Sequence, residues 1–165
     1  KVNQIGWIVT PMDFALEEKR NTVATSASSV QVAVQEFVVR DGADLPGTFN
    51  AMTKAGVDRV LVNNEPLLNS HAGAIAALAA AMKLPAVGYA TFADAGGLLA
   101  YGANRPALYG RVGYFLDRIL KGTKPGDIPF ERAARFDVIV NLKTAKTLGV
   151  TIPQSILARA DRVIQ

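Results

Sequence analysis

Short apolar runs alternate with amphipathic helix patterns along this chain, and that alternation constrains its fold more than any other feature. Runs of about five residues suit buried strands and are too short for buried helices. We predict strands at 5–9, 30–39, 57–62, 86–90, 98–101 and 136–140. We predict helices at 12–27, 45–55, about 70–82, 106–120, 142–148 and 152–164. Strands joined by crossover helices form parallel sheets, so the expected fold class is α/β, a doubly wound and mostly parallel, Rossmann-like sheet.

The composition fits a helix-covered sheet and excludes several kinds of site. Half of the 165 residues are apolar but only 7% are aromatic, so Ala, Val, Leu and Ile must fill most of the core. The lack of cysteine excludes disulfides, thiolate metal sites and cysteine nucleophiles. The net charge of +4 comes from scattered residues without a basic tract, so we expect no nucleic-acid partner. No apolar run approaches the ~18 residues of a membrane span.

The sequence carries no recognisable catalytic signature. His71 is the only histidine, which leaves little for a metal cluster or a catalytic triad. Gly96 and Gly97 lack the spacing of a phosphate-binding loop. Glu17 and Glu18 are adjacent on a helix pattern and therefore do not face each other. We expect no catalytic residue, no bound metal and no cofactor.

Polar and aromatic side chains follow several predicted strands. In doubly wound sheets the ligand crevice lies beyond the carboxyl ends of the strands. Amide, carboxylate, hydroxyl and aromatic groups there could orient a small polar or aromatic ligand. The candidate ligand-binding residues are Thr10, Met12, Asn63, Asn64, Glu65, Tyr89, Thr91, Phe92 and Tyr101. Each has an alternative interpretation, since polar residues after strands also form turns and caps, and tyrosines there also close a core.

Four segments in the last seventy residues carry a resemblance to a known family. They are 92–102 (FADAGGLLAYG), 119–129 (ILKGTKPGDIP), 136–149 (FDVIVNLKTAKTLG) and 152–161 (IPQSILARAD). In this order and spacing they resemble the ABC transporter substrate-binding proteins, in particular the tryptophan- and tyrosine-type uptake proteins. The resemblance implies a type I periplasmic binding protein fold, in which two Rossmann-like lobes close on a ligand.

The resemblance also implies that this chain is the carboxyl-terminal half of such a protein. Residues 1–96 and 130–165 would form the second lobe, and 97–129 would be a hinge-return segment belonging to the first lobe. The implied partners are a small-molecule ligand, an ABC permease in the membrane, and a missing amino-terminal lobe of the same protein or another chain. The chain begins at Lys1, almost inside its first apolar run, which favours a fragment or processed product. The implied location is periplasmic or extracytoplasmic, with a lipoprotein anchor as one option.

By the same resemblance, ligand contacts fall on the loops after Val9, Val62 and Ala90. Glu65 would receive a ligand amine or hydroxyl, and Phe92 and Tyr101 would flank an aromatic ring. A small polar or aromatic ligand, such as an amino acid or an aromatic acid, is therefore expected.

Two other functions remain open from the residues. A ligand-sensing regulatory domain would reuse the same lobe, because fold does not determine function. A doubly wound enzyme would need an acid/base pair in the crevice, for which Glu65 and Asp94 are the candidates.

Overall fold

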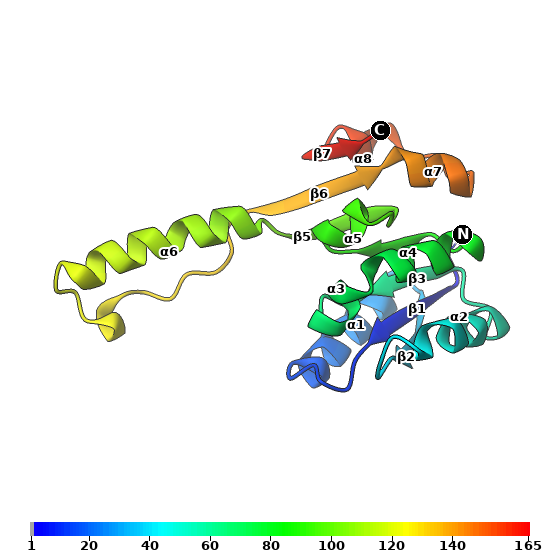
Figure 1. Cartoon of the computed structure of the whole chain (residues 1–165), viewed down its shortest axis with the longest axis horizontal. Coiled ribbons are helices and arrows are strands. Elements are labelled where there is room, and N and C mark those ends of the chain that lie inside the picture. Colours follow the sequence, from blue (N-terminus) through cyan, green and yellow to red (C-terminus); the bar gives the residue numbers. More distant parts are fainter. Residues whose placement is uncertain (1) are drawn as a thin grey trace.

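The computed structural model describes residues 2–165, which form one seven-stranded sheet flanked by helices (Figure 1). The strand order is β2-β1-β3-β4-β5-β6-β7, and all neighbours are parallel except the antiparallel pair β5 and β6. The strands are β1 Gln4–Val9, β2 Ala33–Val38, β3 Arg59–Val62, β4 Ala86–Gly88, β5 Leu99–Ala103, β6 Phe136–Asn141 and β7 Arg162–Ile164. The predicted α/β class with a mostly parallel sheet is confirmed.

Helices lie on both faces of this sheet. They are α1 Leu16–Ser29, α2 Asp44–Lys54, α3 Pro66–Ser70, α4 Ala72–Ala81, α5 Ala90–Asp94, α6 Arg105–Leu120, α7 Leu142–Leu148, α8 Gln154–Leu157 and the 3₁₀ turn η1 Pro125–Asp127. The main core joins one face of β1, β3 and β4 to α2, α4 and α5, with Phe49, Ile75 and Phe92 fully buried. Side chains alternate along a strand, so Ile8 enters this core while Trp7 faces α1 on the other side.

The first helix begins later than the sequence pattern predicts. Residues 10–15 form a turn, because Asp13 accepts a hydrogen bond from the Ala15 amide (3.0 Å) and its own carbonyl accepts one from Leu16 (3.1 Å). Phe14 is therefore fully exposed in a loop, and the predicted start of a helix at residue 12 is wrong. The opposite difference occurs at residues 91–95, which were expected to be a loop and lie largely in the helix α5.

The predicted final helix at 152–164 is also wrong. Only α8 is helical, and β7 then pairs in parallel with β6. Asp161 donates its amide to the Val138 carbonyl (2.9 Å), and Ile164 packs on a small cluster that includes Ala100 and Ile139. The sequence pattern does not reveal that β6 offers an unpaired edge, and that edge draws the last residues into the sheet.

Residues 105–135 extend away from the sheet as an arm, formed by α6 and the chain segment that returns from it (Figure 1). Asn104 caps α6 by accepting a hydrogen bond from the Ala107 amide (2.7 Å). Arg111 pairs with Glu131 through two contacts of 2.6 and 2.9 Å, which joins the helix to the return segment. The predicted hinge-return segment 97–129 thus contains β5, which lies in the sheet, and α6, which lies outside it.

In α6, Phe115 and Arg118 are partly exposed and the other residues are exposed. Its apolar side chains therefore contribute little to the core. Within the described residues, no helix combines the length and apolarity needed to cross a membrane.

Candidate functional site

The carboxyl ends of β1, β3 and β4 meet at one edge of the sheet, where their loops carry most of the predicted site residues. A cavity of about 280 Å³ opens at this edge; we call it the cleft cavity. Its lining consists of Asn64, Tyr89, Ala90, Thr91, Ala100, Gly102, Ala103, Arg105, Pro106, Leu108, Asp137 and Ile139. Of the predicted set, the structure brings Asn64, Tyr89 and Thr91 together around this cavity.

Tyr89 places a buried hydroxyl in the wall of the cleft cavity. Its side chain follows β4, and only 6% of the residue is exposed. The hydroxyl has no hydrogen-bond partner among the described residues. Burial raises the pKa of this phenol to about 12, so the group stays protonated and able to donate at neutral pH.

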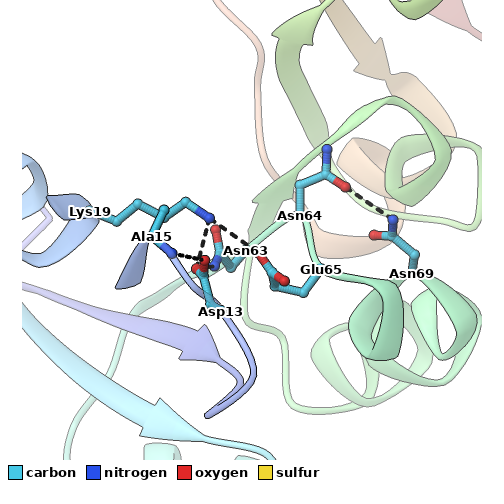
Figure 2. A network of polar contacts seen from close by, with 7 residues as sticks. All are labelled: Asp13, Ala15, Lys19, Asn63, Asn64, Glu65 and Asn69. Atoms are coloured by element: carbon cyan, nitrogen blue, oxygen red, sulfur yellow. Dashed lines mark hydrogen bonds and ion pairs between the residues drawn. The ribbon is translucent and has the colours of Figure 1, made fainter. Parts of the chain in front are cut away.

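Asn64 contributes an oriented amide. Its Oδ1 accepts a hydrogen bond from Asn69 Nδ2 on α3 (3.0 Å), and Figure 2 shows its own amide nitrogen pointing away from that contact. The side chain is thereby held with its NH₂ group available to donate to an acceptor in the cleft cavity.

Phe92 and Tyr101, predicted to flank a ligand ring, lie elsewhere. Phe92 is fully buried, and a Cβ added at Gly97 would approach its ring to 2.4 Å, so the ring is confined within the core. Tyr101 is 61% exposed and stacks on Phe136 with ring centroids 5.6 Å apart. Along β5 its neighbours Ala100 and Gly102 line the cleft cavity, and alternation turns Tyr101 to the opposite face of the sheet.

Thr10 and Met12 are also outside the lining of the cleft cavity. Thr10 is buried at the end of β1, whereas Met12 is 73% exposed on the following loop. The structure therefore places them near the same sheet edge without bringing them to the cavity.

The loops after β1 and β3 are joined by a charged network (Figure 2). Lys19 Nζ donates to Asp13 Oδ2 (2.7 Å) and to Glu65 Oε1 (3.1 Å). Asn63 Nδ2 donates to the same Asp13 oxygen (2.7 Å). Glu65, predicted to receive a ligand group, thus has its carboxylate engaged by Lys19.

Burial opposes both charges in this network and hydrogen bonding overcomes it. Burial alone would raise the pKa of Asp13, but the contacts from Lys19, the Ala15 amide and Asn63 hold it below the ordinary 3.8. Burial alone would lower the pKa of Lys19, but Asp13 and Glu65 raise it above 10.5. Asp13 and Lys19 are therefore both charged at neutral pH.

Arg105 and Asp137 also line the cleft cavity but were not in the predicted site. Arg105 opens α6, directly after the cap residue Asn104. Asp137 accepts a hydrogen bond from Asn104 Nδ2 (2.7 Å). Asp137 was not predicted because the prediction considered only residues after strand carboxyl ends. β6 is antiparallel to β5, which brings the amino end of β6, and with it Asp137, to this edge.

The acid/base pair required for the enzyme alternative is not assembled. Asp94 ends α5 and pairs with Arg162 on the edge strand β7 (2.7 Å), whereas Glu65 follows β3 and pairs with Lys19 (3.1 Å). Across residues 2–165 there is also no group of three or more metal-ligating side chains placed to hold an ion.

The chain as a whole is similar to proteins of a known family. A model of the ABC transporter substrate binding protein family matches residues 1–164. No curated protein matches the chain. Among solved structures, a conserved domain protein from Vibrio cholerae superposes with a TM-score of 0.89 at 22% identity, covering 99% of this chain and 55% of that one.

Two further structures share the fold. An ABC domain from Streptococcus pneumoniae in complex with L-Trp has a TM-score of 0.87 at 26% identity, covering 99% of this chain and 57% of that one. A ligand-free, open substrate-binding protein with adhesive properties from Clostridium difficile has a TM-score of 0.75 at 20% identity, covering 100% and 55%. The chain therefore spans little more than half the length of these proteins. Because the family model matches nearly every residue, this chain belongs to the ABC transporter substrate-binding protein family.

Proposed function

We propose that this chain is the carboxyl-terminal half of a solute-binding protein that captures an amino acid for an ABC importer. The observation that carries the proposal is the chemistry of the cleft cavity. Arg105 and Asp137 supply one group of each charge, and Ala100, Ile139 and Leu108 supply an apolar surface. A zwitterion with an apolar or aromatic side chain has the matching pattern of charges and apolar area.

Neutral groups complete this recognition surface. The Tyr89 hydroxyl is buried without a partner among the described residues, and a ligand carboxylate would satisfy it. The Asn64 amide could donate to the same carboxylate or to a carbonyl. The Streptococcus pneumoniae neighbour was solved with L-Trp, which supports a search that begins with aromatic amino acids.

The arm supports the assignment to one half of a two-lobed protein. Leu108, Val112, Leu116 and Ile119 share one face of α6 and are exposed. Exposed apolar faces of this length usually meet a partner surface. The solved relatives are almost twice as long as this chain. We propose that the arm packs against an amino-terminal lobe of the full-length protein.

Such a protein needs no chemistry at its site. Ligand contacts made on both lobes in the closed form alone would favour closure, and the closed form would dock on a permease. We therefore propose a non-enzymatic transport role outside the cytoplasm.

Calorimetry on the protein in its full natural length tests the proposal. Tryptophan, tyrosine and phenylalanine are compared with tryptamine, which lacks the carboxylate, and indole-3-propionate, which lacks the amine. We expect at least one amino acid to bind about tenfold more tightly than both indole analogues, since each analogue lacks one of the charges that Arg105 and Asp137 would pair. Equal affinity for amino acids and analogues, or no binding by any of them, would contradict the proposal.

A further inference from the structure

Three charged side chains meet beside the cleft cavity: two carboxylates and one ammonium. Lys19 Nζ lies 2.7 Å from Asp13 and 3.1 Å from Glu65. The exposed fractions of the side chains are 36% for Lys19, 4% for Asp13 and 13% for Glu65. Lys19 thus neutralises one of two carboxylates that have little access to water.

The two carboxylates differ in how firmly they are held. Asp13 also accepts hydrogen bonds from the Ala15 amide (3.0 Å) and from Asn63 Nδ2 (2.7 Å). Among the described residues, the Glu65 carboxylate accepts its side-chain hydrogen bond from Lys19 (3.1 Å). Without Lys19, Asp13 would keep two partners, and Glu65 would be repelled by it and free to rotate.

Glu65 is well placed to affect the ligand if it does rotate. Glu65 directly follows Asn64 in the chain, and Asn64 lines the cleft cavity. Lys19 and Asn63 line a different cavity, with Trp7 and Leu61, on the α1 side of the sheet. Glu65 itself is not part of the cleft cavity lining, and its carboxylate is held by Lys19 from the α1 side of the sheet. Figure 2 shows this contact.

We infer that Lys19 is a specificity-determining residue: by holding Glu65, it keeps a free carboxylate out of the cleft cavity and so excludes ligands with an additional positive charge. This inference rests on the proposed amino-acid-binding function. Lys19 acts through Glu65 and is thus a positioning residue.

Matched ligand pairs provide the test. Lysine is compared with 2-aminoheptanoic acid, and 4-(aminomethyl)phenylalanine with 4-ethylphenylalanine. In each pair the shapes agree and only one member carries the extra ammonium. The ratio of the two dissociation constants is measured by calorimetry for wild type, K19M, K19R and K19M/E65Q, all at full natural length. Thermal unfolding verifies that each variant is folded, and K19Q replaces K19M if that variant does not fold.

We expect K19M to shift the ratio toward the cationic ligand by about fivefold or more, as one unscreened carboxylate near the cavity would do. K19R should keep the wild-type ratio, and K19M/E65Q should restore it. A ratio unchanged in K19M, or a shift that persists in K19M/E65Q, would overturn the inference while leaving the proposed function intact. If wild type binds none of the four amino acids nor tryptophan, the proposed function fails and the inference falls with it.

Discussion

The sheet and the arm use similar helix patterns and reach opposite environments. In α2, Phe49 and Met52 are fully buried in the main core, whereas in α6 Leu116 and Leu120 are 53% and 85% exposed. Charge divides in the same way. Residues 105–135 contain seven basic and three acidic residues, which equals the net charge of +4 for the whole chain, so the remainder carries no net formal charge. Basic residues that look scattered in the sequence therefore set the arm apart from the sheet.

This difference teaches that an amphipathic pattern specifies which face of a helix is apolar but not what covers it. The cleft cavity lies where the two regions join, since β5, β6 and the residues directly after β4 contribute with the first turn of α6. Substitutions in the sheet should therefore change stability, substitutions at the junction should change ligand affinity, and substitutions in the arm should change neither within this lobe.

The largest effect is expected from Phe92→Ala. Its fully buried ring fills the space beneath Gly88 and Gly97, so removing it should lower the free energy of unfolding by about 3–5 kcal/mol. The matched arm variant Leu116→Ala should change it by less than about 0.5 kcal/mol. Urea denaturation measures both. Unchanged stability in Phe92→Ala, together with lost ligand affinity, would show that Phe92 is a ligand contact after all.

A smaller loss of about 2–3 kcal/mol is expected from Asp13→Asn, because the variant leaves Lys19 with a weaker partner in a mostly buried network. The loss should depend on pH. The folded pKa of Asp13 is below 3.8, so its contribution is present above that value and disappears as pH falls through the lowered pKa. Unfolding curves recorded between about pH 7 and pH 2 should therefore converge for wild type and variant at the acid end. A constant difference at every pH would exclude an ionised Asp13 as the cause.

The fold was more predictable than the site. Strand positions follow from local apolar runs such as 5–9, and parallel crossovers limit the topology. The last strand was missed because Val163 and Ile164 are stabilised by the edge of β6, which lies more than twenty residues away in sequence.

The site depends on orientation, which local patterns do not specify. Asn64, Tyr89 and Thr91 were found because they follow parallel strands. Tyr101 follows the same rule in sequence, yet the pleat of β5 turns it away from the cavity. Asp137 lies at the amino end of an antiparallel strand, whereas the prediction considered only residues after the carboxyl ends of strands. The engagement of Glu65 by Lys19 required knowing that α1 begins at Leu16.

Tyr89→Phe tests the junction. The hydroxyl has no partner among the described residues, so its loss should leave the unfolding free energy within about 0.5 kcal/mol or slightly raised. Affinity for the preferred amino acid should fall about tenfold or more, since one hydrogen bond to a charged group contributes about 1.5–3 kcal/mol. The control Tyr101→Phe removes a hydroxyl on the opposite sheet face and should leave affinity unchanged. Equal affinities for wild type and Tyr89→Phe would remove this hydroxyl from the proposed site.

The smallest effect is expected where the arm holds itself together. Arg111→Ala removes the paired contacts with Glu131 and the stacking of the guanidinium over Tyr114, whose ring centroid lies 3.9 Å away. All three side chains are substantially exposed, and exposed pairs contribute little to global stability. The unfolding midpoint should therefore stay the same, while limited trypsin cleavage after Lys121 becomes faster as the return segment loses its tie to α6. Leu116→Ala, which leaves this tie intact, should be cleaved at the wild-type rate. A lowered midpoint in Arg111→Ala would instead mean that the arm and the sheet unfold as one cooperative unit. The two regions would then differ in shape but not in stability.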